Sequence, residues 1–506
     1  MKKLTALVLA LLMMVAIVAG CANTSDGTPQ ETTPAISGNP GEVTPGGDGE
    51  GGEVVETTPA ETVPEFVEED YNEDQFLIFQ RSENATSYRG FYIDSPEPID
   101  TMSEAVFARN LAVEEKYNVV IETLQQLEPY KDIRTYLASG DVPFDLILDR
   151  RTYLGSLALE GCFYNFNDLE YVDFSKPYWD SNCAEGYEVA GKLFFMANDV
   201  SVSNLADARF LYFNRALVDR YDLEDPYKLI DNNQWTLDKF LELVRSVSTD
   251  NGDNVWDGND VYGLCSETGD SNSNILHWLV GCGLRFIEKD SSGELLTNVY
   301  NDKTQSIMTR VADTLEGTQY ALTFNNAAKG ADTSGYANIY DYGRSLFASD
   351  HFLFIEGNMD ISHQFRDMTS DYGVAPNPKY DSAQEEYYHK MDRFSLIWAI
   401  PKCNMDYEQL GILFEYWAYE SSKTVMPAFY EITIKTKRVP DEKASAMIDV
   451  VKDSIRYDLT EIYNGEIPPV VYNGYASGNL ASAWKAGQRM IQRKLDSIYT
   501  DISELE

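Results

Sequence analysis

Histidine is scarce in this chain, which has only 4 histidines among 506 residues. The 6 cysteines stand at positions 21, 162, 183, 265, 282 and 403, and no two of them have the CxxC spacing typical of zinc sites. The sequence therefore argues against a zinc centre. Two alternatives remain for the cysteines: disulfides, with Cys265–Cys282 and Cys162–Cys183 as candidate pairs, or buried free thiols.

Basic residues are also few. The chain has 40 lysines and arginines against 82 aspartates and glutamates, which gives a formal net charge of −42. Such a surface repels nucleic-acid phosphates and anionic lipid headgroups, so we expect neither as a partner. After residue 20 no apolar run approaches the roughly 18 residues of a membrane-spanning helix.

Motifs of common enzyme classes are missing as well: the chain has no G-x-S-x-G elbow, no HExxH and no phosphate-binding P-loop. A glycan hydrolase needs only two carboxylates across the scissile bond, but among 82 acids such pairs carry almost no information. We therefore assign no catalytic residue and expect a protein that is not an enzyme. A surface-anchored glycan-degrading enzyme stays the alternative.

The N-terminus has the order of a secretory signal, which we place at residues 1–20. Lys2 and Lys3 precede an apolar run over residues 4–18, and small residues lead to Cys21. Val18-Ala19-Gly20-Cys21 resembles a bacterial lipobox, in which the cysteine carries acyl chains such as palmitate. This motif predicts a secreted protein that is lipid-anchored to the outer face of the bacterial cell membrane. The alternatives are an ordinary signal cleaved nearby and an uncleaved anchor helix.

Residues 21–70 are predicted to form a disordered linker behind the lipidated cysteine. Between residues 22 and 70 the chain is rich in glycine, proline and threonine, and it has 12 acids but no lysine or arginine. Such a segment cannot bury enough apolar surface to offset the entropy of ordering it. A flexible, acidic segment of this length would hold a folded body away from a membrane.

From Tyr71 the composition changes, and short apolar runs alternate with helical patterns. This order predicts a parallel α/β organisation. The expected strands lie at residues 76–79, 119–121, 145–148, 193–196, 210–213, 374–376 and 396–400. Helices are expected at 105–117, 133–138, 407–421, 441–457 and 478–500, at 236–247 with Thr236 as the N-cap, and over most of 275–315 and 342–368.

Five stretches together resemble the extracellular solute-binding proteins of family 1, the lipid-anchored receptors of bacterial ABC importers that are related to the maltose-binding protein. These stretches are Phe210 to Leu217, Gln234 to Phe240, Phe354 to Met359, Asp371 to Lys379 and Gly465 to Pro469, and the resemblance covers roughly residues 75–500. One position departs from the maltose receptor: Asn358 and Met359 stand where it carries a tryptophan just after the glycine. That departure puts maltose itself in doubt.

The resemblance implies a type II periplasmic-binding-protein-like fold, in which two α/β lobes are joined by crossing strands. Residues 71–200 and 374–430 would form the first lobe, and residues 201–373 and 431–506 the second. Two lobes are also expected because about 435 ordered residues are too many for one core. The implied partners are a sugar or oligosaccharide held between the lobes and ABC permease subunits in the membrane, and we expect a monomer. Binding of a peptide, or sensing without transport, stays open.

Residues 249–260 align with a twelve-position calcium loop. The ligands would be Asn251, Asp253, the Val255 carbonyl, Asp257 and Asp260. Two positions depart from the pattern, because Thr249 stands at position 1 and Asn254 at position 6. The other interpretation is a polar turn rich in Asn and Asp. No cofactor is required, and a structural Ca²⁺ is the one ion that the sequence indicates.

Aromatic residues make up 12% of the chain. Aromatic faces flanked by acids and amides suit sugars, which present apolar C–H faces and rims of hydroxyls. We expect Trp235 and Trp256 to be structural. The candidate ligand-binding residues are Trp179, Asp180, Trp278, Tyr340, Glu356, Trp398, Tyr475 and Trp484.

Overall fold

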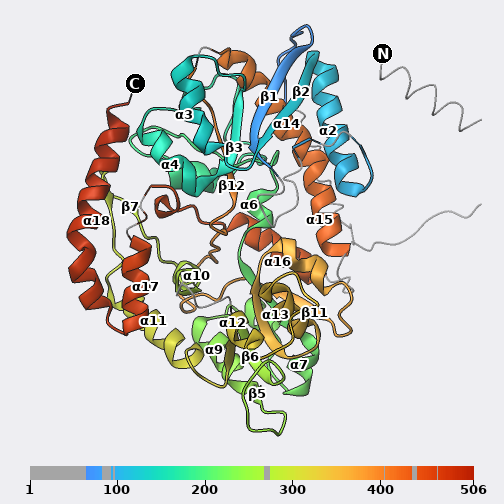
Figure 1. Cartoon of the computed structure of the whole chain (residues 1–506), viewed down its shortest axis with the longest axis vertical. Coiled ribbons are helices and arrows are strands. Elements are labelled where there is room, and N and C mark those ends of the chain that lie inside the picture. Colours follow the sequence, from blue (N-terminus) through green and yellow to red (C-terminus); the bar gives the residue numbers. More distant parts are fainter. Residues whose placement is uncertain are drawn as a thin grey trace, which may run out of the picture. The chain divides into compact units, whose positions relative to one another are not determined.

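The computed structural model describes residues 64–82, 93–94, 97–266, 274–403, 405–435, 442–463, 465 and 467–505 (Figure 1). The chain divides into a unit at Met1–Pro64 and a folded unit at Glu65–Glu506. The predicted signal peptide, Cys21 and most of the predicted linker lie outside the described residues. In the described part, no helix is both long enough and apolar enough to cross a membrane.

A first sheet has the strand order β12-β3-β1-β2. Its strands are β1 (Asp74–Arg81), β2 (Val119–Gln126), β3 (Leu146–Arg150) and β12 (Leu396–Ala399). β1 runs parallel to both β2 and β3, whereas β12 is antiparallel to β3. β3 and β12 form because their short runs are apolar and bury almost every side chain, as strands do in a sheet covered on both faces.

Helices from distant parts of the chain cover this sheet. The helices of the N-terminal half are α2 (Thr101–Tyr117), α3 (Tyr130–Ser139), α4 (Arg151–Leu159), α5 (Ser181–Tyr187) and α6 (Ser203–Ala206), with a 3-10 turn η2 (Phe166–Asp168). α2 packs against α14 (Tyr407–Lys423) and α15 (Val425–Lys435), which come from the C-terminal quarter (Figure 1).

The folded unit begins before Tyr71. The ring of Phe66 lies 4.9 Å from that of Tyr416 and 4.8 Å from that of Tyr419, both on α14. Lys116 on α2 also forms a 2.7 Å ion pair with Glu68. The last residues of the predicted linker are therefore packed against α2 and α14.

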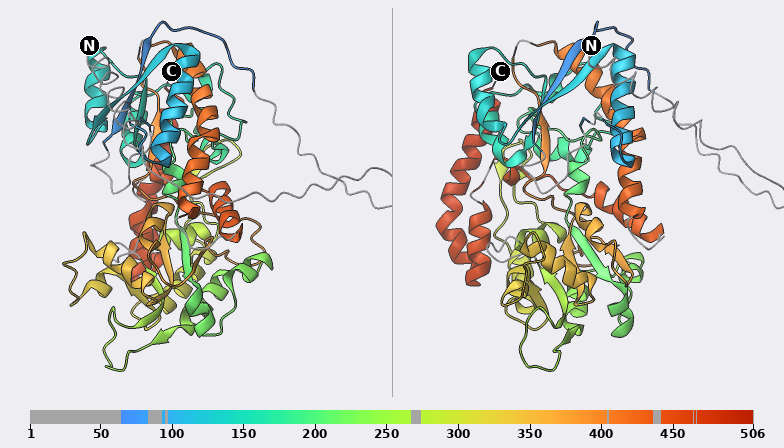
Figure 2. Two further views of the ribbon diagram at one scale, coloured as in Figure 1. Left: turned by 90° about the vertical axis from the view of Figure 1, so that its right-hand side faces the viewer. Right: turned by 45° about the vertical axis from the view of Figure 1, so that its right-hand side comes forward.

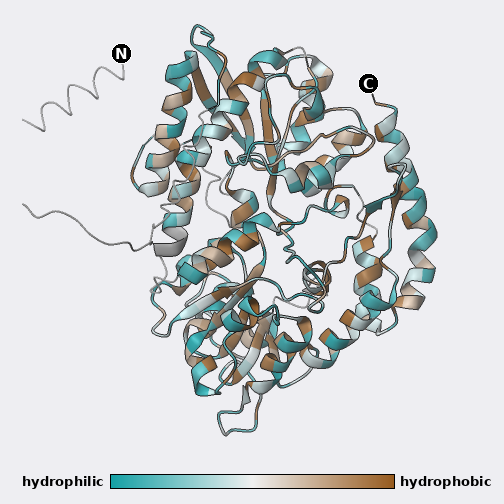
Figure 3. Ribbon diagram, turned by 180° about the vertical axis from the view of Figure 1, so that it is seen from behind, coloured by the Kyte–Doolittle hydropathy of each residue, from teal (hydrophilic) through white to brown (hydrophobic). Residues whose placement is uncertain are grey.

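A second sheet has the order β11-β4-β10-β6-β5, and β9 also pairs with β6. Its strands are β4 (Phe210–Asn214), β5 (Ser248–Thr249), β6 (Val261–Ser266), β9 (Ala321–Thr323), β10 (Phe352–Gly357) and β11 (Tyr372–Ala375). β6 is parallel to β9 and β10, and β4 is antiparallel to β10 and β11. Hydrophobic residues run along the strands of both sheets (Figure 3). The boundaries predicted for the two lobes stay a prediction.

The remaining elements surround the second sheet or follow it. They are α7 (Arg215–Arg220), α8 (Pro226–Asp231), α9 (Leu237–Ser246), α10 (Asn274–Gly281), β7 (Glu288–Lys289), β8 (Leu295–Leu296), α11 (Asp302–Leu315), α12 (Phe324–Ala328), α13 (Ile339–Ala348), η3 (Met359–Phe365), α16 (Glu442–Asp453), η4 (Leu459–Glu461), α17 (Ile467–Ser477) and α18 (Leu480–Ser503). α17 and α18 form a hairpin, and α18 also contacts α4 and β8 (Figure 2).

Three chain segments lie side by side between the two sheets. Ala208 forms a bridge with Met391, and His389 forms one with Ile455. The segments around these residues lead from the first sheet to the second or back, because β4 follows Ala208 and β12 follows Met391. We call residues 207–209, 389–392 and 454–457 the crossing segments.

Arg151 connects α4 to one crossing segment and to η4. Its guanidinium donates to the Asp392 carbonyl at 2.7 Å and forms a 2.8 Å ion pair with Glu461. Both side chains are buried, with 0% and 9% exposed. Burial alone would lower the pKa of Arg151, but the carboxylate of Glu461 and the hydroxyl of Tyr187 raise it above the ordinary value.

The elements agree with most of the sequence predictions. Thr236 caps α9 by accepting a hydrogen bond from the Lys239 N–H, as predicted. The strand predicted at residues 193–196 is wrong: this buried segment forms only an isolated bridge, between Met196 and Trp398, because β12 already pairs with β3 through a full ladder. The helical prediction for 342–368 is wrong at β10, since periodicity alone does not separate a short, fully apolar strand from a buried helix.

The five cysteines at positions 162, 183, 265, 282 and 403 are free thiols. Cys183, Cys265 and Cys282 are buried. Burial raises the pKa of Cys282 to about 12. Of the two alternatives for these residues, the structure supports free thiols, and Cys21 lies outside the described residues.

Asp145 gives the folded unit a measurable pH dependence. Its carboxylate accepts a hydrogen bond from the Leu77 N–H at 2.7 Å, but burial dominates and raises its pKa from 3.8 to about 6. The folded state therefore binds this proton more tightly than the unfolded state, so the contribution to stability is present below the unfolded pKa and is lost as pH rises through about 6. We expect Asp145→Asn to reduce the fall in unfolding free energy between about pH 4 and pH 6. Urea unfolding across this range tests it, and equal slopes for both proteins would contradict it.

Candidate ligand-binding site

The carboxyl ends of the strands in both sheets lie beside the crossing segments. Leu396, the first residue of β12 after a crossing segment, is opposite Arg150 at the end of β3. In the same way Phe210, the first residue of β4, is opposite Gly357 at the end of β10. In open α/β sheets, ligands bind outside the carboxyl ends of the strands, at the point where the strand order reverses. For the first sheet that point lies between β1 and β3.

A cluster of charged and aromatic side chains occupies that point. Arg81, the last residue of β1, forms a 2.6 Å ion pair with Asp149 on β3, and both side chains are buried. The guanidinium of Arg81 lies 5.4 Å from the ring of Tyr153, which stacks on Tyr130. Within the described residues, Nη2 of Arg81 has no hydrogen-bond partner. The edge of the first sheet thus presents a buried donor beside an aromatic face.

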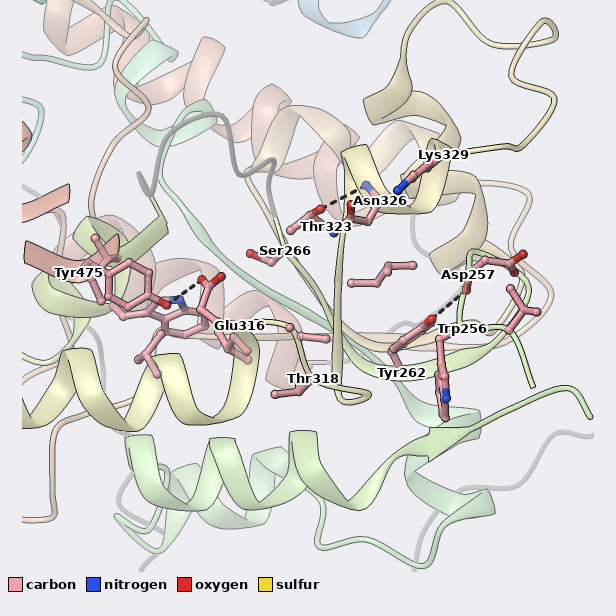
Figure 4. A pocket seen from close by; sticks show the side chains of 18 of the residues that line it. Trp256, Asp257, Tyr262, Ser266, Glu316, Thr318, Thr323, Asn326, Lys329 and Tyr475 are labelled. Atoms are coloured by element: carbon pink, nitrogen blue, oxygen red, sulfur yellow. Dashed lines mark hydrogen bonds between the residues drawn. The ribbon is translucent and has the colours of Figure 1, made fainter. Parts of the chain in front are cut away.

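A cavity of about 690 Å³ lies at the ends of β6 and β9 in the second sheet (Figure 4). We call it the ligand cavity. Ser266 and Thr323, the last residues of the two strands, lie at its middle, with Glu316 and Tyr475 on one side and Trp256 and Asp257 on the other. Its lining includes four aromatic side chains, those of Trp256, Tyr262, Trp278 and Tyr475.

At one end of the ligand cavity, Tyr475 interacts with two glutamates, of which Glu316 lines the cavity and Glu356 does not. The Tyr475 hydroxyl donates to Glu316 at 2.8 Å, across 159 positions of sequence. Burial raises the pKa of Tyr475, and the carboxylates of Glu316 and Glu356 raise it further. Glu356 is buried on β10 next to β6. Tyr475 is therefore a neutral donor at neutral pH.

Trp278 supplies an unused donor in the same cavity. It is 1% exposed, and its ring stacks on Phe240 at 4.9 Å. In the described structure its indole Nε1 has no hydrogen-bond partner. A buried N–H without a partner is costly, so a ligand that accepts from it would be favoured.

The structure places two of the predicted ligand-binding residues, Trp278 and Tyr475, on the wall of the ligand cavity. Glu356 does not line the cavity, although its carboxylate acts on Tyr475. The other predicted residues lie elsewhere. Tyr340 is exposed on α13, and Trp398 is fully buried on β12 against Phe414 and Trp417. Trp484 on α18 stacks on Tyr300, with ring centroids 6.3 Å apart. Ligand contact by these three residues stays a prediction.

Trp179 and Asp180 lie at a second cavity, of about 360 Å³. The residues that line it are all different from those of the ligand cavity. The indole N–H of Trp179 donates to Glu415 at 2.7 Å. The carboxylate of Asp180 accepts from the Tyr457 hydroxyl at 2.5 Å and from two backbone N–H groups at the start of α5.

Comparison with known proteins agrees with this geometry. No family model matches the chain, and no curated protein matches it. Among solved structures, the sugar-binding protein MalE from Xanthomonas citri superposes with a TM-score of 0.54 at 12% identity, over 83% of this chain and 97% of that one. An ABC substrate-binding protein from Listeria monocytogenes in complex with cycloalternan gives a TM-score of 0.50 at 12% identity, over 84% and 99% of the two chains. The chain has the fold of an ABC substrate-binding protein.

A cyclo/maltodextrin-binding protein complexed with maltotetraose gives a similar match, with a TM-score of 0.51 at 12% identity over 85% of this chain and 97% of that one. The predicted two-lobed α/β fold is confirmed by these matches and by the two open sheets. Since the identities are low, the resemblance stated from the sequence is confirmed for the fold.

The predicted calcium loop holds itself together with its own side chains. Asp260 accepts from the N–H groups of Asn251 and Asp257, both at 2.8 Å. Asp253 accepts from the Val255 N–H at 2.8 Å, and Asn254 has the left-handed φ of 60° that position 6 of a calcium loop requires. In the part of the chain that the structure describes, no three His, Cys, Asp or Glu side chains gather as a metal site would need.

Calcium binding by this loop stays a prediction. If the native state binds Ca²⁺, adding Ca²⁺ to chelator-treated protein raises the melting temperature. Replacing Asp253 with alanine would then abolish the rise, because position 5 loses its oxygen ligand. A melting temperature that responds to neither EDTA nor Ca²⁺ would leave the polar turn as the correct interpretation.

Sequence reasoning missed several residues of the site. Arg81 and Asp149 carried a usable signal, because Asp149 directly follows a buried apolar strand run and Arg81 follows another after a single intervening residue, Gln80. Glu316 and Thr323 carried no such signal, because glutamate and threonine are common at the ends of helices and strands. Trp256, which we expected to be structural, lines the ligand cavity.

Proposed function

We propose that this protein is the substrate-binding component of an ABC importer and captures a sugar or oligosaccharide in the ligand cavity. The observation that carries the proposal is the unused indole N–H of Trp278 in a cavity with aromatic walls. Supporting it, the structures with the same fold are named for sugar binding or were solved with cycloalternan or maltotetraose.

The chemistry of the cavity fits carbohydrate better than a charged solute. The walls combine aromatic side chains with short hydroxyl and amide groups, among them Ser266, Thr323 and Asn326. Sugar hydroxyls both donate and accept, so they match the Trp278 donor and the Glu316 acceptor at once. A cavity of about 690 Å³ lies within the usual range for small-ligand sites, which extends from about 300 to 1,000 Å³.

Ligand capture would proceed by closure of the two α/β lobes about the crossing segments. The ligand cavity on the second sheet would hold the sugar, and the Arg81–Asp149 cluster on the first sheet would close over it. A ligand shifts the equilibrium between open and closed forms only by its differential affinity for the closed one. The closed form would then dock on permease subunits, with Cys21 and its acyl chains holding the protein at the outer face of the membrane.

A thermal-shift screen tests this function. Sugars and oligosaccharides that bind the native state raise the melting temperature, by an amount that grows with ligand concentration over Kd. We expect at least one carbohydrate to do so and short peptides to have no effect. A shift with peptides alone would overturn the sugar assignment. Steady release of dye from a chromogenic glycan by purified protein would instead favour the glycan-degrading enzyme.

A further inference from the structure

The second cavity, at which Trp179 and Asp180 lie, plays no part in the function proposed above. Four segments build it: residues 174–182, residues 198–205, Met426 on α15 and residues 452–455 at the end of α16. Ile455 belongs to a crossing segment, where it bridges to His389. We call this space the Asn198–Asn204 cavity.

Two buried amides in this cavity lack hydrogen-bond partners. Asn198 is 4% exposed, and its Nδ2 donor has no partner within the described residues. Asn204 is 8% exposed, and its Oδ1 acceptor also has none there. One side chain thus offers an unused donor and the other an unused acceptor. Buried polar atoms in native proteins are nearly always paired, so unpaired ones that line a cavity point to an occupant.

An ion pair adds a second donor and acceptor. Lys452 and Asp199 lie 3.6 Å apart, and an occupant beside this pair can bond to either group. Burial raises the pKa of Asp199 to about 6, although Lys452 opposes the shift. The Asp180 carboxylate is already used by Tyr457 and the start of α5, so it orders the wall and does not face an occupant with a free oxygen.

The charges select against ionic occupants. The lining contains Lys176 and Lys452 against Asp180, Asp199 and Asp453, so phosphates and carboxylates would meet a net negative wall. A cation would meet the unused N–H of Asn198 and the ammonium of Lys452. A neutral hydroxyl is both donor and acceptor, and two adjacent hydroxyls could engage the Asn pair and the Asp199–Lys452 pair together.

We propose that the Asn198–Asn204 cavity is a second binding site, which takes a small neutral compound with adjacent hydroxyl groups. The volume of about 360 Å³ suits a monosaccharide or a short acyclic polyol and not an oligosaccharide. Trp179, 3% exposed with its N–H committed to Glu415, provides an apolar wall. The site is independent of what the ligand cavity binds.

Saturation-transfer NMR on the whole protein tests this site. The probes are D-glucose, D-galactose, D-mannose, sorbitol and glycerol, so that cyclic sugars and acyclic polyols are separate arms. The main variant is Asn204→Leu, which removes the unpaired acceptor and keeps the number and branching of the side-chain heavy atoms. The matched control is Asn232→Leu, at an exposed asparagine that lines neither cavity. Lys452→Met is a second variant, in the last turn of α16, where the side chain is 33% exposed.

We expect at least one probe to show saturation transfer with the wild type and with Asn232→Leu, and to lose it with Asn204→Leu. Without ligand, Asn204→Leu should melt at the same temperature as the wild type or higher, because it removes the unpaired buried acceptor Oδ1. Should Asn204→Leu fail to fold, loss of the signal in Lys452→Met supports the site. Absence of transfer from every probe to the wild type overturns the proposal. Transfer that persists in folded Asn204→Leu and Lys452→Met, each combined with Glu316→Ala to weaken the ligand cavity, overturns it as well. If only ligand-cavity variants lose carbohydrate binding, the second site is still supported and the function proposed for the ligand cavity is tested separately.

Discussion

Replacing Glu316 with alanine is expected to weaken carbohydrate binding by about 10- to 100-fold, because hydrogen bonds to charged groups contribute roughly 1.5–3 kcal/mol. Glu316 ends α11 at the ligand cavity and accepts from the Tyr475 hydroxyl at 2.8 Å. Its loss removes an acceptor for sugar hydroxyls and also frees Tyr475 to move. Isothermal titration with the carbohydrate that gives the largest thermal shift measures the change.

Two further variants separate the reasons for that loss. Glu316→Gln keeps an acceptor for Tyr475 but removes the charge, so we expect it to retain more affinity than Glu316→Ala. Glu294→Ala removes an exposed acid on the β7–β8 turn, which lines neither cavity. If Glu316→Ala and Glu294→Ala bind the carbohydrate equally well, Glu316 has no part in the site.

Replacing Arg151 with methionine is expected to cost about 3 kcal/mol of unfolding free energy, the low end for a broken buried ion pair. The reason is that Glu461 would lose its 2.8 Å partner and keep only Lys390 at 3.3 Å, and the crossing segment would lose the donor to the Asp392 carbonyl. A decrease of that size should show as a lower midpoint in urea unfolding followed by tryptophan fluorescence.

Arg134 offers a matched control. It forms an ion pair with Glu160 at 2.6 Å, but the two side chains are 48% and 47% exposed. Exposed pairs contribute about 0–1 kcal/mol, so Arg134→Met should shift the midpoint little. Equal midpoints for Arg151→Met and Arg134→Met would contradict the account of Arg151 as the residue that holds the crossing segments together.

Local sequence patterns were enough for most elements of the fold. β1, β3 and β12 were predicted because short apolar runs are buried on both faces, and α9 because Thr236 caps it. β10 was missed because its apolar run closely follows the helical pattern of α13, and periodicity alone does not show where the helix ends. The crossing segments could not be derived from local patterns, since each bridge joins residues far apart in the chain.

The kinds of residue in the site could be predicted from the sequence, but their interaction partners could not. Trp278 and Tyr475 were predicted because aromatic residues suit sugars, and the structure places both at one cavity. The partner of Tyr475 could not be predicted, because Glu316 lies 159 positions away and 82 acids compete for the role. Trp179 and Asp180 were grouped with these residues by chemistry alone, whereas the fold separates them into another cavity.

A crystal structure with the best carbohydrate of the thermal-shift screen tests the central claim most directly. We expect ring density in the ligand cavity, with a sugar oxygen accepting from the Trp278 indole N–H and a hydroxyl donating to Glu316. We also expect the Arg81–Asp149 cluster to close on the same ligand. Carbohydrate bound elsewhere, with Trp278 and Glu316 untouched, would contradict it.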